Sequence, residues 1–203
     1  MLDTSFQRRA SPGVSLHSGN SPSATALLVG WCEGLAIVNV RGNPDDAAFR
    51  DAVSQPLGVP LPLLAGSCCG GDPVRIVWAG PNEWFVIGPM GQADSVVSQL
   101  RIALAGTHHA VTDVSSGYTV LSLAGQPVRE VLAQGCPLDL HPRVFKKDHA
   151  AGTHYFKASV WLWQTEPAPA FGLLVRNSFR NYVSLMLERC GAECGLVTRR
   201  FSS

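Results

Sequence analysis

The sequence has few charged residues for its length. Only 15% of its 203 residues are Asp, Glu, Lys or Arg, where a soluble domain usually carries about 25%. Sixteen basic and 15 acidic side chains leave a formal net charge of +1, so the chain has no strong field with which to attract nucleic acid or an anionic membrane. A surface short of charge favours a chain whose exposed face is covered by partners, and we interpret it as a subunit of a larger assembly.

The sequence also has no long hydrophobic run. Its longest apolar stretches, such as residues 26–29 and 84–87, are far shorter than the roughly 20 residues that a membrane-crossing helix needs. Residues 1–24 are rich in Ser, Pro, Gly and Asn and contain no apolar core of the kind that a signal peptide carries. We therefore expect a cytoplasmic protein that neither enters a membrane nor binds nucleic acid.

No pair of cysteines has the Cys-x-x-Cys spacing of a zinc site, and no histidines lie at the matching distance. Cys190 and Cys194 are four residues apart, which would place both thiols on one helix face. The glycine between them, Gly191, equally favours a fraying helix end. We predict no metal site, and we expect six reduced, mostly buried thiols. The six are Cys32, Cys68, Cys69, Cys136, Cys190 and Cys194.

The usual catalytic motifs are missing as well. The chain has no Gly-x-x-x-x-Gly-Lys phosphate loop, no His-Glu-x-x-His and no Gly-x-Ser-x-Gly. The glycine-rich residues 66–71 lack the spacing of a dinucleotide-binding loop, so we interpret them as a mobile loop. Asp113, Ser115 and His109 supply the residue types of a triad, but Ser115 has no visible oxyanion device. We predict no catalytic, cofactor-binding or metal-binding residue in this chain.

Secondary-structure signals are clear despite these absences. Short β-branched runs predict strands, Asn43-Pro44 resembles the start of a helix, and Gly106 is placed to end one. The first half therefore predicts, in order, a strand at 35–40, a helix from Asn43 to about Gln55, a hairpin of strands 74–78 and 84–87, and a helix at 92–105.

The second half repeats this order. It predicts a strand at 118–123, a helix at 128–133, one long or bulged strand over 154–164, a strand at 171–175 and a helix capped by Asn177. We therefore predict an α+β fold of two related split β-α-β modules, with helices packed on antiparallel or mixed sheets. The expected parts are a flexible N-terminal arm (1–25), a first module (26–107), a second module (108–195) and a C-terminal tail (196–203).

Five tryptophans are many for a chain with so little charge, and tryptophan is enriched where protein surfaces anchor each other. Trp161 and Trp163 share one strand face by period two, while Trp78 and Trp84 lie on either side of a turn across which they could stack. Core packing is the alternative interpretation of each one.

Histidines occur in two notable places. His108 and His109 are adjacent, so on a strand they point to opposite faces, which favours a loop-to-strand junction over a shared site. His141-Pro142-Arg143 has a stiff centre flanked by donors for an anion or a partner's carboxylate, with an exposed turn as the alternative. The interface candidates are Trp31, Trp84, His141, Arg143, Trp161 and Trp163.

Three segments carry a resemblance to a known family. Residues 80–89 read Gly-Pro-Asn-Glu-Trp-Phe-Val-Ile-Gly-Pro, residues 113–121 read Asp-Val-Ser-Ser-Gly-Tyr-Thr-Val-Leu, and residues 135–142 read Gly-Cys-Pro-Leu-Asp-Leu-His-Pro. Together they resemble the gamma subunit of heterotetrameric sarcosine oxidase, over about residues 35–190. Residues 113–132 are more weakly similar to the folate-binding aminomethyltransferases of the glycine cleavage system, which implies an aminomethyltransferase-like fold.

The resemblance implies an enzyme of four different chains. Such an enzyme oxidises sarcosine with oxygen to glycine, hydrogen peroxide and formaldehyde, and tetrahydrofolate captures the formaldehyde as methylenetetrahydrofolate. FAD, covalently held FMN, NAD and the folate site belong to the alpha and beta chains, and zinc belongs to the delta chain. The family's gamma chain is not its catalyst, so we expect a structural subunit of this chain, with alpha, beta and delta partners. A retained folate or amino-acid site between the two modules is the alternative.

Overall fold

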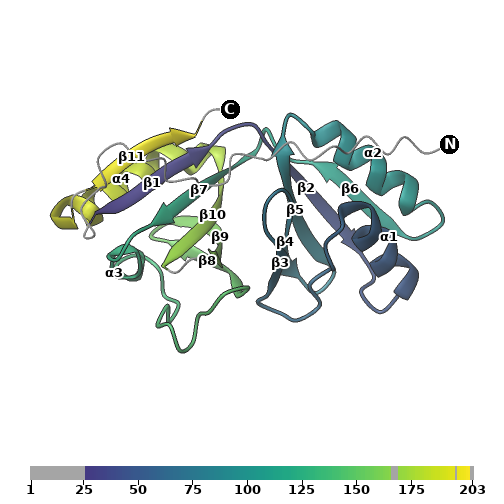
Figure 1. The fold of residues 1–203 in the computed structure, drawn as a ribbon, viewed down its shortest axis with the longest axis horizontal. Coiled ribbons are helices and arrows are strands. Elements are labelled where there is room, and N and C mark those ends of the chain that lie inside the picture. The colour runs from purple at the N-terminus through teal and green to yellow at the C-terminus, as the bar shows by residue number, and fades with distance from the viewer. Residues whose placement is uncertain (1–25, 166–168, 195, 202–203) are drawn as a thin grey trace.

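A computed structural model describes residues 26–165, 169–194 and 196–201, and the predicted arm at 1–25 lies outside them. In chain order (Figure 1) the elements are β1 (Leu27–Cys32), β2 (Leu35–Gly42), α1 (Ala47–Leu57), β3 (Cys68–Gly70), β4 (Arg75–Gly80), β5 (Glu83–Met90), α2 (Ala93–Ala103), β6 (His109–Asp113), β7 (Tyr118–Ala124), α3 (Val128–Ala133), β8 (Ala150–Tyr155), β9 (Ala158–Thr165), β10 (Ala170–Arg176), η1 (Asn177–Phe179), α4 (Arg180–Gly191), η2 (Ala192–Cys194) and β11 (Leu196–Phe201).

The strands form two sheets that face each other. The five-stranded sheet has the order β3-β4-β5-β2-β6, and the six-stranded sheet has the order β11-β1-β7-β10-β9-β8. Helices α1 and α2 cover the outer face of the first, and α3 and α4 cover the outer face of the second (Figure 1). This is the predicted α+β class with two similar halves, and all pairings are antiparallel except that of β1 with β11.

Three apolar clusters fill the layers. One lies under α1 and α2, where Phe49 and Leu100 are buried, and another lies under α3 and α4, where Val131 and Leu187 are buried. The third combines side chains of both sheets and forms the layer between them: Ile37, Cys68, Val77, Phe85, Ile87, Val120, Ala150, Trp163 and Leu174. The two halves are thus joined by a continuous apolar layer.

Each sheet takes one strand from the other half of the sequence. Strand β1 pairs with β7 and β11 in the six-stranded sheet, while β6 pairs with β2 in the five-stranded sheet. The expected modules 26–107 and 108–195 would instead place β1 with the strands of the five-stranded sheet and β6 with those of the six-stranded sheet. Residues 196–201, expected as a tail, form β11 beside β1. Sequence periodicity identifies a strand but not the sheet that it joins, which explains the difference.

The first helix begins and ends later than predicted. The Asp46 side chain accepts a hydrogen bond from Ala48 N and caps α1, whereas Asn43 Oδ1 accepts from Asp45 N in a preceding turn. Pro56 lies inside the last turn of the helix, and Gly58 ends it with a positive φ of 64°. A last-turn proline is tolerated because the helix stops at the next residue.

The glycine-rich loop contains a strand. Residues 68–70 form β3, which pairs with β4 through Cys68 and Val77, Cys69 and Ile76, and Gly70 and Arg75. The expectation of a mobile loop is therefore wrong for this stretch. Gly70 has a φ of +83°, and a Cβ there would lie 2.4 Å from Val74 O, so glycine is required for this close turn.

Two predictions in the second half also need correction. Residues 154–164 are not one strand but parts of a hairpin, β8 and β9, whose turn holds Phe156 at a φ of 51°. The Phe156 N–H donates to Gly135 O at 2.7 Å, which ties the turn to the end of α3. Asn177 does not cap an α-helix: its side chain donates to Ser116 O, and the α-helix begins at Arg180 after η1.

The described cysteines are six free thiols, of which Cys68 and Cys136 are buried and the other four are half-buried. The expectation of mostly buried thiols is met only in part. Helix α4 ends at Gly191 and Cys194 lies in η2, which confirms the helix-end alternative for this pair. No group of three or more His, Cys, Asp or Glu residues placed to hold a metal occurs in the described residues.

Candidate interaction surface

Two of the predicted interface tryptophans lie inside the chain. Trp84 is fully buried against Phe49, with ring centroids 5.7 Å apart, and Trp163 is buried in the layer between the sheets. Neither offers surface to a partner, so both interface predictions are wrong. Both tryptophans are core residues, as large aromatic side chains often are. Trp78 is the register partner of Trp84 across the hairpin, but among the described residues the ring that packs against Trp84 is that of Phe49.

Two other tryptophans are half-buried. Trp31 donates its indole N–H to Ser184 Oγ at 3.2 Å, and the Arg180 guanidinium lies 5.0 Å from the centre of its ring. Trp161 meets Phe85 edge to face at 4.8 Å, in the layer between the sheets. Trp161 lies in the same intersheet layer as Trp163, as its spacing predicted. Most of their surface is used for contacts within the chain.

His141 and Arg143 are exposed, on the long connection between α3 and β8. The His141 N–H donates to Asp139 Oδ1 at 2.9 Å, and the Arg143 N–H donates to His141 Nδ1 at 3.2 Å. These bonds shape a turn in which both residues are exposed. Both residues remain candidates for an interface.

This connection, residues 134–149, is held from beneath by Arg129. Its guanidinium donates to Leu140 O, to Phe145 O at 3.5 Å and to Gln164 Oε1 at 3.0 Å. It also lies 5.0 Å from the centre of the Phe171 ring. Burial lowers the pKa of Arg129, but a guanidinium keeps its charge at any ordinary pH. One half-buried cation therefore fixes the shape of the whole connection.

The second long connection, residues 58–67, is held in a similar way. The buried Trp84 indole donates its N–H to Pro62 O at 2.8 Å, and the Leu61 N–H donates to Ser54 Oγ at 3.0 Å. Leu61 is buried, but the next two leucines are not: Leu63 is 52% exposed and Leu64 is 76% exposed. Two large apolar side chains thus stand on a loop that the core holds in place.

The two connections meet each other. Ser67 forms an isolated bridge with His149, the Cys68 N–H donates to Asp148 O at 2.8 Å, and the Ala150 N–H donates to Gly66 O at 2.8 Å. We call residues 58–67 and 134–149 the loop pair. It also exposes Val144, which is 52% exposed. These apolar residues are not among the interface candidates chosen from the sequence, although the Leu-Pro-Leu-Leu run at 61–64 inside a Pro-rich connection indicates them.

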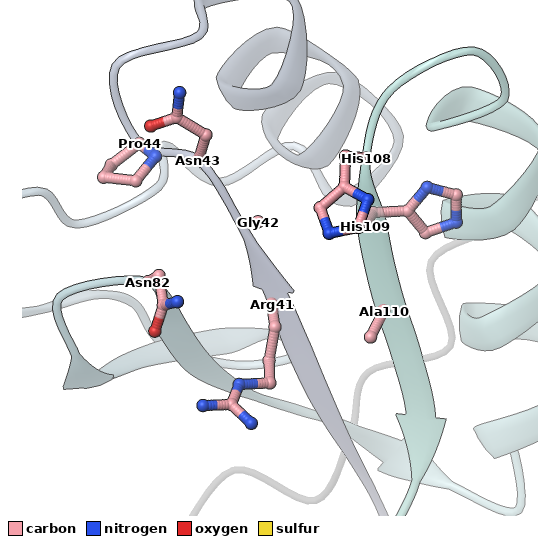
Figure 2. A pocket seen from close by; sticks show the side chains of 8 residues that line it. All are labelled: Arg41, Gly42, Asn43, Pro44, Asn82, His108, His109 and Ala110. Carbon is pink, nitrogen blue, oxygen red and sulfur yellow. The ribbon is translucent and has the colours of Figure 1, made fainter.

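A cavity of about 560 Å³ lies in the five-stranded half, where β2 ends and the neighbouring β6 begins. Figure 2 shows the rings of His108 and His109 on opposite sides of β6, as their adjacency predicted. Arg41 lines the cavity, and its Nη2 lies 3.6 Å from Oε2 of Glu83, which is not part of the lining. The lining contains no carboxylate, hydroxyl or thiol side chain; it consists of Arg41, Gly42, Asn43, Pro44, Asn82, His108, His109 and Ala110.

The residue types of a triad do not converge. The Ser115 hydroxyl donates to Asp113 Oδ1 at 2.5 Å and accepts from Ile37 N at 2.9 Å, while His109 Nδ1 bonds to Thr107 O at 3.0 Å. Serine and aspartate here fix a turn between β6 and β7. The Ser115 hydroxyl donates to a carboxylate and not to an imidazole, and its oxygen accepts a backbone N–H, so it is held as part of the turn.

Two of the thiols, the half-buried Cys32 and the buried Cys68, are also unreactive. Burial raises the pKa of Cys32 and of Cys68 to about 11, although Arg75 opposes the shift at Cys68. A thiol with so high a pKa is almost wholly protonated near neutral pH, and the thiolate is the reactive form.

Among the described residues, no helix is long and apolar enough to cross a membrane.

Comparisons with known proteins give a consistent result. Residues 41–193 match the model of the sarcosine oxidase, gamma subunit family. A sarcosine oxidase subunit gamma from Corynebacterium sp. (strain P-1) is 33% identical over 178 residues, which cover 86% of this chain and 85% of that relative. A chain of the heterotetrameric sarcosine oxidase from Corynebacterium sp. U-96, solved in complex with pyrrole 2-carboxylate, has a TM-score of 0.77 at 26% identity, covering 84% of this chain and 86% of that one.

A more distant structure shares the fold. The aminomethyltransferase T of the glycine cleavage system from Bartonella henselae has a TM-score of 0.63 at 11% identity, over 85% of this chain and 47% of that one. The predicted aminomethyltransferase-like fold is thereby confirmed.

Proposed function

The chain belongs to the sarcosine oxidase gamma subunit family, and we propose that it serves as a non-catalytic structural subunit of a heterotetrameric sarcosine oxidase with alpha, beta and delta partners. The resemblance inferred from the sequence is confirmed by the family match and by the relatives. The predicted cytoplasmic location belongs to the same proposal.

One observation carries the structural role. The groups in this chain that resemble catalytic ones are each engaged in holding its own backbone: Ser115 and Asp113 fix a turn, His109 bonds to Thr107 O, and Arg129 holds a loop. A catalytic centre needs a nucleophile, a base and a stabiliser of developing charge around one shared space. No such set meets among the described residues.

In this proposal the chemistry belongs to the partners. The assembly oxidises sarcosine with oxygen and water to glycine, hydrogen peroxide and formaldehyde, and passes the formaldehyde to tetrahydrofolate. FAD, FMN and NAD are held by the alpha and beta chains and zinc by the delta chain. The shared fold with aminomethyltransferase T is fold evidence alone, and the described layer between the sheets is apolar, which does not favour a folate site there.

Expression of the chain with and without the alpha, beta and delta chains tests the proposal. Alone, we expect a colourless protein of poor solubility without oxidase activity; together, we expect a defined, yellow complex that releases hydrogen peroxide from sarcosine. The control is the three partners without this chain. A monomer that ignores the partners would contradict the structural role, and a flavin or sarcosine turnover on the isolated chain would contradict the non-catalytic one.

A further inference from the structure

We propose that the loop pair is the docking surface of this chain for an apolar, acid-rimmed face of another subunit of the assembly. Its apolar side chains are Leu63 and Leu64 on one connection and Val144 on the other, and its basic side chains are Arg143 and Lys146. This inference rests on the proposed structural role and names the surface through which that role is performed.

The apolar side chains are held in place from inside. Leu63 and Leu64 follow directly on Pro62, whose carbonyl oxygen accepts a hydrogen bond from the buried indole of Trp84 at 2.8 Å. Val144 lies next to Phe145, which is buried and whose ring meets that of His149 at 5.8 Å. Apolar side chains on a fixed backbone lose little conformational freedom on docking, which favours a specific contact.

The length of the second connection supports the same conclusion. Residues 134–149 join α3 to β8 without a helix or strand, and connections of this length in compact domains usually have a function. The Arg129 guanidinium donates to the carbonyl oxygens of Leu140 and Phe145 from within the molecule. The fold therefore uses a half-buried cation to fix the shape of a segment on which Arg143, Val144 and Lys146 are exposed.

The charges of the loop pair select the kind of partner. Residues 134–149 carry three basic and two acidic side chains, a net charge of +1. Of the basic ones, Arg143 and Lys146 are exposed and form no ion pair within the described part of the chain, and His141 lies beside them. The other connection, residues 58–67, carries no charge at all. A second copy of this chain would place the same cations opposite one another, which is unfavourable in a symmetric contact. An apolar face with an acidic rim, on a different subunit, fits both features.

The experiment uses the complete chain, co-expressed with the alpha, beta and delta chains. The tagged chain is separated from the co-expressed complex and immobilised at low density, where poor solubility does not interfere. Its binding to the complex of the other three chains is measured by biolayer interferometry. Leu64→Asp is compared with Ile102→Asp, because Ile102 on α2 is 77% exposed and Leu64 is 76% exposed. We expect Leu64→Asp to weaken binding by at least about 30-fold and Ile102→Asp by less than about threefold.

The basic side chains are tested by a second matched pair. Arg143→Glu is compared with Arg189→Glu, which reverses an exposed arginine on α4. We expect Arg143→Glu to slow association by about tenfold at low salt, and the difference from the unmodified chain to shrink as salt rises from about 50 mM to about 300 mM. Arg189→Glu should leave the association rate within about twofold.

The outcomes separate this inference from the proposed function. If the unmodified chain does not bind the other three, the structural role itself is wrong. If it binds and Leu64→Asp behaves like Ile102→Asp, only the docking surface is wrong, and Val144→Asp repeats the test should Leu64→Asp not fold. A variant that dissociates a dimer of this chain but still binds its partners would assign the surface to a second copy and overturn the inference.

Discussion

The two connections of the loop pair are built in opposite ways. Residues 58–67 carry no charge and are held by a neutral donor, the fully buried indole of Trp84. Residues 134–149 carry five charged side chains and are held by a cation, Arg129. The indole belongs to the core of the five-stranded sheet, whereas the guanidinium spans the space between a helix, a sheet and the connection itself. One anchor is a core residue with one polar atom, and the other is a polar residue with several partners.

The two anchors stabilise the chain by different kinds of interaction. A buried tryptophan contributes mainly through its apolar area, and its single hydrogen bond adds orientation. The arginine contributes mainly by satisfying carbonyl oxygens that would otherwise be buried without donors. We therefore expect changes at Trp84 to affect the whole five-stranded half, and changes at Arg129 to affect chiefly the connection that it binds.

The largest expected effect is that of Trp84→Ala. Removing a fully buried indole leaves a cavity beside Phe49, and such truncations cost about 3–5 kcal/mol of the free energy of unfolding. Denaturant unfolding at low protein concentration measures the loss. Trp84→Phe is the matched control, because it keeps a ring but removes the donor to Pro62 O; we expect it to cost about 1–2 kcal/mol. Equal losses for the two variants would mean that the hydrogen bond, not the ring, is the anchor.

Arg129→Met should have a smaller and more local effect. The change keeps an unbranched side chain but removes the donors to Leu140 O, Phe145 O and Gln164 Oε1, at a cost of about 2 kcal/mol. Hydrogen exchange should become faster over residues 134–149 and stay unchanged over β2 and β5. Arg129→Lys keeps the charge but not the planar set of donors, so we expect it to restore only part of the protection. Uniformly faster exchange would contradict a local anchor.

The contrast also explains what the sequence predicted well. Strands such as β2 and β7 and helix α3 follow from local patterns, since β-branched runs and capping residues act within a few positions. The repeat of strand, helix, strand, strand and helix correctly predicted two similar halves. The resemblance quoted from residues 80–89 and 135–142 identified the family, and the structure places the second of these segments in the loop pair.

What the sequence did not predict depends on distant contacts. Sheet membership of β1 and β6 is decided by pairing with strands far along the chain. The short strand β3 exists because β4 is beside it. The interface candidates failed at Trp84 and Trp163 for the same reason, because an apolar residue type predicts burial but not whether a core or a partner buries it. Leu63 and Leu64 are the opposite case, because they are apolar residues that the chain leaves exposed.

The junction between the two connections should be sensitive to alkaline pH. Cys68 directly follows the bridge of Ser67 with His149, and burial raises the pKa of its thiol from 9.0 to about 11. Folding then favours the neutral thiol, so this stability is present below about pH 9 and is lost as the pH rises from 9 to 11. We expect a loss of about 1 kcal/mol at about pH 10, which Cys68→Ala should not show. Parallel pH profiles for both proteins would contradict this assignment.

The smallest expected effect is on the stability of the chain itself when the outer side chains are changed. Leu64→Ser and Val144→Ser remove side chains that are 76% and 52% exposed, so each should change the free energy of unfolding of the isolated chain by less than about 0.5 kcal/mol. Leu61→Ser, three residues before Leu64 and buried, should cost several times more. The two anchored connections would then differ in how they are held but agree in presenting side chains that the chain does not need for its own folding. A loss above about 1 kcal/mol at Leu64 would show instead that this leucine packs within the chain, and it would remove Leu64 from the docking surface.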